Sequence, residues 1–353
     1  MTGEDRRFQD ELLPGVSRTF ALTIPQLPRP LRDVVTNAYL LCRIADTIED
    51  EVSLDAGEKR AFHDLLTAAV SGGDGAAELV RDLVPRLSAQ TSVAERALVA
   101  DTARVVAVTH GFPERPRAAV ARCVAIMCER MPEFQRTARL SGLADLAELD
   151  RYCYSVAGVV GEMLTELFCD YSAAAERNRA ALMSRAVSFG QGLQMTNILK
   201  DVWEDRARGV CWLPRDLFAR RGVELGEMTI TSAAHDAGAT GSSAASPSPD
   251  VASAFADGMA ELVEIARGHL RNALEYTLAI PSSEPGIRRF CLWALALAVL
   301  TLRKIEETPG FTSGAQVKVS RRVVRATAVA TALAARSDRA IRWWFGRAGV
   351  GEG

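Results

Sequence analysis

The sequence predicts an all-α protein built as a helical bundle. Apolar residues recur at three- and four-residue spacing, the period of an amphipathic helix, through most of the 353 residues. No stretch alternates apolar and polar residues as a half-buried strand would, and no glycine-rich phosphate loop follows a strand. The common nucleotide-binding α/β folds are therefore excluded. We expect helices over 31–50, 60–70, 93–109, 116–137, 144–169, 177–205, 251–279, 287–307 and 317–346.

The composition is that of an ordinary globular protein. Hydrophobic residues make up 48% of the chain and charged residues 24%, and the net charge at pH 7 is −2. A chain of this length can bury a large core. The weak net charge argues against nucleic acid as a partner. The seven cysteines are odd in number and never spaced C-x-x-C, which predicts reduced thiols rather than a disulfide scaffold or a zinc site.

One segment interrupts the helical pattern. Residues 231–250 consist mainly of Ala, Gly, Ser and Pro, a composition typical of a flexible surface loop. The helical pattern resumes unchanged beyond this segment. We therefore expect a single domain over 1–353 with an inserted loop at about 231–250, in preference to two domains.

The sequence also predicts where the protein resides. The first eleven residues are polar and charged, so we expect no signal peptide. The longest apolar stretch, Phe290–Leu302, is too short to span a bilayer and predicts a buried helix. These features predict a cytoplasmic protein without a transmembrane helix.

Arginines flank a cluster of aromatic residues near the C-terminus, a pairing that suits peripheral contact with an anionic membrane. Packing of the aromatic side chains onto the bundle is the alternative. The residues concerned are Arg336, Arg339, Arg342, Trp343, Trp344, Phe345 and Arg347.

The pentapeptide D-x-x-E-D occurs twice, from Asp46 to Asp50 and from Asp201 to Asp205. On a helix the two aspartates of each copy share a face, where they repel one another. A bound hard cation would offset this repulsion, and magnesium is usually held by one or two carboxylates together with waters and phosphate oxygens. Two such helices facing each other would hold a diphosphate between metal ions. The candidate magnesium ligands are Asp46, Glu49, Asp50, Asp201, Glu204 and Asp205.

Each copy lies in a longer polar stripe along an otherwise apolar helix. The stripes are Tyr39, Arg43, Asp46 and Asp50, spaced 4, 3 and 4, and Gln194, Asn197, Asp201 and Asp205, spaced 3, 4 and 4. A polar line of this kind costs desolvation free energy unless its groups are paired or liganded. Arg43, Lys200 and Arg208 would supply cations to phosphate oxygens. Solvated helix faces with salt bridges are the alternative, but the repetition of the motif favours a ligand site.

These motifs resemble those of the squalene and phytoene synthase family. Ser17-Arg-Thr-Phe20 and the stretch from Tyr39 to Asp50 resemble the first substrate motif of that family. Gln194 to Asp205 resembles its second motif, and Tyr152 to Gly161 resembles its central helix. The similarity covers roughly residues 15–220 and continues more weakly to about 325.

The resemblance implies an isoprenoid-synthase helical bundle around a central cavity. It also implies head-to-head joining of two allylic diphosphates, usually farnesyl diphosphate, through a cyclopropylcarbinyl diphosphate. The motif aspartates would hold Mg²⁺, and Phe20 would line the cavity, where an aromatic face steadies a carbocation. The residues that would contact prenyl diphosphates are Ser17, Arg18, Tyr39, Arg43, Gln194, Asn197, Lys200 and Arg208. Gly158 and Gly161 would let the central helix open or approach substrate, or would serve helix packing.

Within the family, two segments resemble the reductive, squalene-forming branch. Phe290–Leu302 resembles the apolar helix of squalene synthases, with Phe290 in the cavity. Val317 to Arg322 resembles their basic segment linked to NADPH. Lys318, Arg321 and Arg322 would pair with the 2′-phosphate of NADPH, and a solvated basic turn is the alternative.

Two departures from the squalene synthase pattern bear on the product. Ser155 stands before Val156, and Tyr154 lies one place earlier, as in phytoene-type enzymes, so which of Tyr154 and Ser155 assists proton removal stays open. Val210 replaces an arginine that is common after the second motif. The alternative functions are therefore a non-reductive dehydrosqualene or phytoene synthase and a presqualene diphosphate synthase. A chain-elongating prenyltransferase or terpene cyclase usually shows D-D-x-x-D, which is absent, and an inactive homologue acting as a scaffold is a further alternative.

Overall fold

The structure is a computed structural model that describes all residues except 18, 138, 229–247 and 351–353. The predicted all-α class is confirmed, because all the secondary-structure elements of the described residues are helices. The β-type pairing in that part of the chain is an isolated bridge between Leu143 and Pro214. The α-helices are α1 (Gly3–Val16), α2 (Phe20–Thr23), α3 (Leu31–Asp50), α4 (Ala56–Val70), α5 (Ala76–Leu83), α6 (Val93–Ala100), α7 (Thr102–His110), α8 (Glu114–Thr137), α9 (Leu146–Cys153), α10 (Val159–Tyr171), α11 (Ala173–Glu176), α12 (Arg179–Lys200), α13 (Val202–Ala207), α14 (Arg215–Ala219), α15 (Pro249–Ala279), α16 (Pro285–Glu307), α17 (Arg321–Ala334) and α18 (Asp338–Arg347). Short 3₁₀ turns cover Ile24–Gln26, Val84–Arg86 and Leu225–Glu227, and a π-helical turn, Tyr154–Gly158, joins α9 to α10.

Periodicity located most of the helices but missed several breaks. Helix α3 has the predicted bounds, whereas the predicted helices 93–109, 177–205 and 317–346 are each divided in two. The divisions fall at Asp101, at Asp201 and just before Ser337, whose side chain accepts a hydrogen bond from the Ala340 N–H and so begins α18. Helix α1 was not predicted, although a capping box between Thr2 and Asp5 marks its start.

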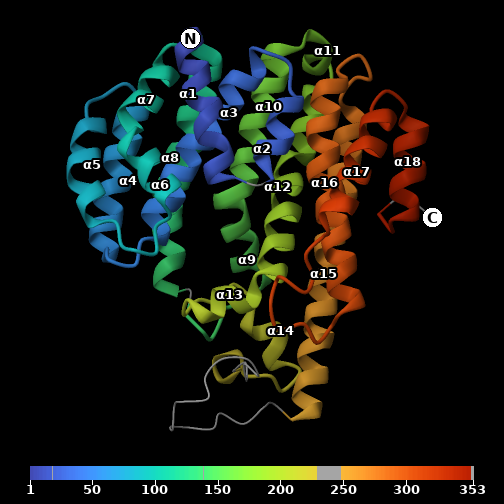
Figure 1. Cartoon of the computed structure of the whole chain (residues 1–353). Coiled ribbons are helices and arrows are strands. Elements are labelled where there is room, and N and C mark those ends of the chain that lie inside the picture. The colour runs from blue at the N-terminus through green and yellow to red at the C-terminus, as the bar shows by residue number, and fades with distance from the viewer. Residues whose placement is uncertain (18, 138, 229–247, 351–353) are drawn as a thin grey trace.

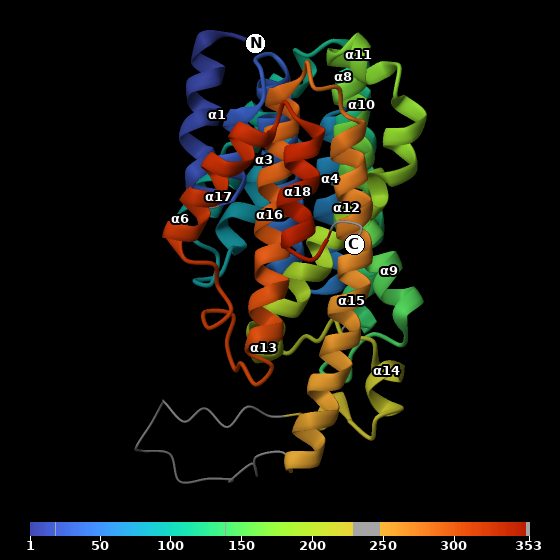
Figure 2. The same ribbon diagram turned by 90° about the vertical axis from the view of Figure 1, so that its right-hand side faces the viewer.

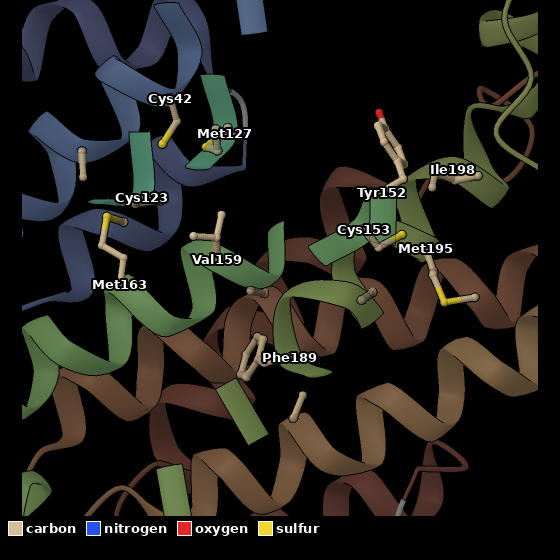
Figure 3. Close-up of a cluster of buried hydrophobic side chains, with 14 of the residues drawn as sticks. Cys42, Cys123, Met127, Tyr152, Cys153, Val159, Met163, Phe189, Met195 and Ile198 are labelled. Atoms are coloured by element: carbon tan, nitrogen blue, oxygen red, sulfur yellow. The ribbon is translucent and has the colours of Figure 1, made fainter. Parts of the chain in front are cut away.

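The long helices stand roughly parallel and form the centre of the bundle (Figure 1). Helices α12 and α15 run side by side, and α16 packs against both. Helix α3 contacts α7, α8 and α10 on the other side, and 15 of its 20 residues are buried. Helices α4 to α7 cover one edge of the molecule, while α17 and α18 cover α16 at the opposite edge (Figure 2). Cys42, Cys123 and Met163 lie buried where α3, α8 and α10 meet (Figure 3).

Glycines allow α12 to pack closely against α10 and the π-helical turn. A Cβ on Gly161 would lie 2.1 Å from the backbone oxygen of Ala186, and one on Gly190 would lie 2.1 Å from that of Ala157. Real Cβ atoms do not approach an oxygen so closely, so each site admits glycine alone without movement of the backbone. The sequence left open whether Gly161 serves helix opening, substrate approach or helix packing, and the structure shows that it serves helix packing.

Helix α16 is longer than the apolar stretch that predicted it. It spans 23 residues with a mean hydropathy of 1.4 in its most apolar window, so among the described residues it is the one helix long and apolar enough to cross a membrane. The predicted stretch, Phe290–Leu302, lies inside this longer helix. However, 61% of that window is buried inside the protein, as predicted for a core helix.

Two predictions concern the ends of the inserted segment and of the chain. Most of the predicted loop at 231–250 lies outside the described residues, and α15 begins at Pro249 with Ser248 as its N-cap. The single-domain organisation stays a prediction. At the C-terminus Phe345 is buried and Trp344 packs beside it with ring centroids 4.6 Å apart, so the packing alternative holds for these two aromatic residues. Trp343 is 65% exposed.

Candidate active site

A cavity of about 910 Å³ lies at the centre of the bundle. Along both α3 and α12 its lining changes from apolar to charged toward the C-terminal end of the helix, from Val35 to Asp50 and from Ala186 to Asp201. The apolar part is completed by α8, α10, α15 and α16. The cavity contains thirteen of the residues expected from sequence: Phe20, Tyr39, Arg43, Asp46, Glu49, Asp50, Gln194, Asn197, Lys200, Asp201, Asp205, Arg208 and Phe290.

The first motif lies at the C-terminal end of α3. Asp46 pairs with Arg43 at 3.6 Å, and Arg43 also forms an ion pair with Glu95 of α6. The Asp46 carboxyl is enclosed by the walls of the cavity, and this burial raises its pKa to about 7, with further contributions from the charges of Asp50 and Glu95. Burial likewise raises the pKa of Asp50. The ionised carboxylates of the first motif are therefore poorly solvated.

The second motif spans the junction between α12 and α13. Asp201 pairs with Lys200 at 3.1 Å, and Asp205 pairs with Arg208. Burial raises the pKa of Asp205 to about 6, and the charges of Asp201 and Asp50 add to this effect. The Arg208 guanidinium acts on Asp50 as well as on Asp201 and Asp205. The two motifs therefore face one another, with Arg208 between them.

This carboxylate set fits magnesium. Burial raises the pKa values of Asp46, Asp50 and Asp205, and a divalent cation beside them would favour their ionised forms. Within the described ranges no three His, Cys, Asp or Glu side chains form a preassembled metal-binding group. Magnesium does not need one, because it takes one or two carboxylates and fills its remaining positions with water and phosphate oxygens. Asp46 and Asp50 on one wall and Asp201 and Asp205 on the other would hold it beside a diphosphate.

A model of the squalene/phytoene synthase family matches residues 13–323. The chain belongs to this family. The squalene synthase ERG9 of Candida albicans is 26% identical over 305 residues, which cover 85% of this chain and 61% of that relative. The squalene synthase BSS of Botryococcus braunii is 32% identical over 235 residues, which cover 64% of this chain and 46% of the relative. The chain thus spans about three fifths or less of the length of these relatives.

Solved structures support the fold of this family member. A ligand complex of TcSQS superposes with a TM-score of 0.73 at 21% identity, covering 99% of this chain and 93% of the other. A dehydrosqualene synthase superposes with a TM-score of 0.61 at 18% identity, covering 98% and 97%. The isoprenoid-synthase helical bundle expected from sequence is confirmed.

Glu204, a candidate metal ligand in this squalene/phytoene synthase homologue, is used differently. It is absent from the cavity lining, and its Oε1 accepts a hydrogen bond of 2.8 Å from the Gly314 N–H. The Trp203 indole N–H donates to the Phe311 carbonyl at 2.7 Å. Because Asp201 and Asp205 occupy the face toward the cavity, the residues between them point toward the segment that follows α16. The structure thus places Glu204 as an anchor for that segment.

The substrate-binding candidates divide into those that reach the cavity and those that do not. Gln194, Asn197 and Lys200 line it together, and the Lys200 ammonium donates to the Asn197 side chain at 3.4 Å. Tyr39 lines it too, but its hydroxyl donates to the Val16 carbonyl at 3.1 Å. Ser17 is not part of the lining; its hydroxyl oxygen accepts the Phe20 N–H. Arg18 lies outside the described residues.

Tyr154 and Ser155, the candidates for proton removal, do not line the cavity. The Tyr154 hydroxyl donates to Glu162 at 3.3 Å, and the Ser155 hydroxyl donates to the Arg151 carbonyl at 2.8 Å. The wider π-helical turn at Tyr154–Gly158 explains this placement, because its extra residue changes which side chains face inward. Tyr152 and Val156 line the cavity instead.

Sequence reasoning missed several residues of the lining. Tyr152 stacks on Trp212 with centroids 3.9 Å apart, and burial raises its pKa, with Glu49, Asp50 and Asp205 contributing. Its hydroxyl therefore lies near both motifs. The other missed residues include Lys59, Glu95, Phe168, Phe189 and Tyr276. Glu95 had a local signal, since Ser92-Val-Ala-Glu95 forms a capping box, but nothing in that pattern indicates its pairing with Arg43.

The basic segment expected to bind NADPH lies outside the cavity lining, and Lys318, Arg321 and Arg322 are exposed. The segment just before it is fixed to the second motif through the Phe311 and Gly314 contacts. A Cβ on Gly314 would lie 3.0 Å from the Lys200 carbonyl oxygen and 3.1 Å from an Asp201 carboxylate oxygen. The chain thus passes directly over Asp201 shortly before it reaches Lys318.

Proposed function

We propose that this protein joins two farnesyl diphosphates head to head into presqualene diphosphate, using Mg²⁺, and then reduces this intermediate to squalene with NADPH. The observation that carries the proposal is the cavity in which two D-x-x-E-D motifs face each other beside a large apolar volume. Similarity to squalene synthases of Candida albicans and Botryococcus braunii supports it.

The two parts of the cavity suit the two demands of this chemistry. Bound magnesium would supply Lewis acidity toward the departing diphosphate. Arg43, Lys200 and Arg208 lie among the carboxylates, where each would pair with phosphate oxygens. The carbocation left behind must be kept from water, and the apolar walls provide that environment. Phe20 and Phe290 would present aromatic faces to it.

The support for the reductive step is the basic segment after α16. Lys318, Arg321 and Arg322 are exposed cations suited to a 2′-phosphate, and the segment before them is held over Asp201. The main alternative is a non-reductive dehydrosqualene or phytoene synthase, or release of presqualene diphosphate. Val210 favours it, because an apolar side chain lines the cavity where the squalene synthase pattern has an arginine. Tyr154 and Ser155 do not decide between these products, since neither lines the cavity.

Product analysis with and without NADPH tests the proposal. The purified chain is incubated with farnesyl diphosphate and Mg²⁺, and the extracted products are identified by gas chromatography and mass spectrometry. We expect squalene with NADPH, and presqualene diphosphate or its rearranged alcohols without it. Dehydrosqualene under both conditions, or phytoene when geranylgeranyl diphosphate is supplied in a parallel incubation, would replace the reductive assignment. No turnover of any prenyl diphosphate would favour the scaffold alternative.

The NADPH segment is tested separately by Lys318→Ala combined with Arg321→Ala. We expect a higher KM for NADPH in squalene formation and an unchanged rate of presqualene diphosphate formation. Arg117→Ala, at an exposed arginine of α8, is the matched control and should change neither quantity. Equal loss of both half-reactions in the double variant would contradict the assignment of this segment to the cofactor.

A further inference from the structure

The outward face of α17 combines cations with exposed apolar side chains. Arg322, Arg325, Val329 and Leu333 are spaced 3, 4 and 4, so they form one stripe, and Arg336 follows just beyond the end of the helix. Val329 is 61% exposed and Leu333 is 80% exposed, and the three arginines are exposed as well. Thr327 and Thr331 on the opposite face are buried. The buried face holds α17 against the bundle and leaves the stripe facing outward.

Exposed apolar side chains are concentrated in this part of the molecule. Four of the nine large apolar side chains that are exposed in the described part of the chain lie in the last two helices: Val323, Val329, Leu333 and Trp343. Helices α17 and α18 lie next to each other at the surface and cover α16 (Figure 2). Arg347 lies over the Trp343 ring, 5.4 Å from its centroid. Large exposed apolar groups gathered in this way mark an interaction surface.

The same region is strongly basic. Between Val317 and Val350 the chain has eight basic residues and one acidic residue, Asp338, although the whole protein has a net charge of −2. Asp338 is already paired with Arg288 of α16. Among the described residues, no carboxylate oxygen lies within 4.0 Å of the Arg325, Arg336 or Arg339 guanidinium. Their charge is available to an external partner.

We propose that the outward face of α17, together with Trp343 of α18, binds the surface of an anionic lipid bilayer. Arginines that flank valine, leucine and tryptophan match such a surface, because the cations meet lipid headgroups while the apolar groups enter the acyl boundary. A second copy of the chain is disfavoured, since the same face would bring like charges together. Nucleic acid would leave Val329 and Leu333 without apolar partners. The surface shares Arg322 with the segment assigned to NADPH, but the proposal does not depend on the reaction assigned above.

Vesicle co-sedimentation of the full chain tests the proposal, with vesicles of phosphatidylcholine alone and of phosphatidylcholine with about one third phosphatidylserine. We expect binding to the anionic vesicles that weakens as salt is raised, because surface charge is screened over about 10 Å at 0.1 M salt. Each cation near an anionic surface strengthens binding about fivefold. Arg325→Gln, Arg336→Gln and Arg339→Gln combined should therefore weaken it about a hundredfold. Arg322 is left unchanged because it is a candidate for NADPH.

The apolar half of the surface is tested by Val329→Glu combined with Leu333→Glu, which should abolish binding while the exposed positions leave folding and turnover intact. The matched control is Val93→Glu on α6, where the side chain is 86% exposed at the opposite edge of the molecule (Figure 1). Brominated lipid should quench tryptophan fluorescence, and Trp343→Phe should remove that quenching. Vesicle binding that survives the α17 substitutions would overturn the proposal. A dimer of the unmodified protein that is lost in the Val329→Glu, Leu333→Glu variant would also overturn it and would assign the face to a second copy of the chain.

Discussion

Alanine at Gly161 is expected to destabilise the protein, although alanine is normally the better helix former. The new Cβ would lie 2.1 Å from the Ala186 carbonyl oxygen, whereas even a tight contact requires about 3.0 Å. Helices α10 and α12 must therefore separate locally by about 1 Å. Overpacking of this kind typically costs about 1–3 kcal/mol, and here the obstructing atom belongs to backbone, which cannot rotate away.

Helix propensity acts in the opposite direction. Replacing glycine by alanine inside a helix contributes about 1 kcal/mol of stability when nothing obstructs the methyl group. Gly268 of α15 provides the control, because the nearest atom to its Cβ position is 3.8 Å away, at the end of the flexible Arg271 side chain. We therefore expect Gly268→Ala to stabilise by about 1 kcal/mol and Gly161→Ala to destabilise by about 1–2 kcal/mol or more.

Thermal unfolding measured by circular dichroism compares the two variants. In domains of up to about 250 residues, 1 kcal/mol shifts Tm by about 2–4 °C, so the variants should differ by about 5 °C or somewhat more. Gly161→Ala should also lower turnover, because both helices line the cavity. If Gly161→Ala melts at or above the temperature of the unmodified protein, the close approach of α10 and α12 does not exist as described.

Three further predictions concern charged groups. Asp50→Asn or Asp201→Asn should lower turnover by orders of magnitude and leave the circular dichroism spectrum unchanged; near-normal turnover in both would contradict the magnesium assignment. Glu204→Gln should retain most turnover, because the amide oxygen still accepts the Gly314 N–H, and a loss equal to that of Asp201→Asn would restore Glu204 as a ligand. Burial lowers the pKa of His63 to about 4, so the unfolded state binds its proton first and stability falls as pH drops from about 6.5 toward 4. Between pH 7 and 4.5 the unmodified protein should lose about 2–3 kcal/mol more stability than His63→Gln in urea unfolding; parallel pH curves would refute this.

The fold and the centre of the site could be predicted because both depend on local periodicity. Residues of α3 that are three or four apart share a face wherever the helix packs, so Arg43, Asp46 and Asp50 were certain to occur together. The pairing of Arg43 with Glu95 was not predictable, since it joins α3 to a helix about fifty residues away. The outward placement of Tyr154 was missed because one additional residue per turn leaves no mark in the hydrophobic pattern.

The two D-x-x-E-D copies are identical at their defining positions but differ in backbone. The first lies within one uninterrupted, largely buried helix, so its carboxylates are held at a fixed separation before any ligand arrives. The second straddles Asp201, which ends α12 and precedes α13 with φ −98° and ψ 14°. The position of the Asp201 carboxylate therefore depends on a junction between two helices, which the hydrogen bond between Glu204 and the Gly314 N–H ties to the segment after α16. We expect the same substitution made in each copy not to be interchangeable, because the second copy is positioned by this contact as well as by its own helices.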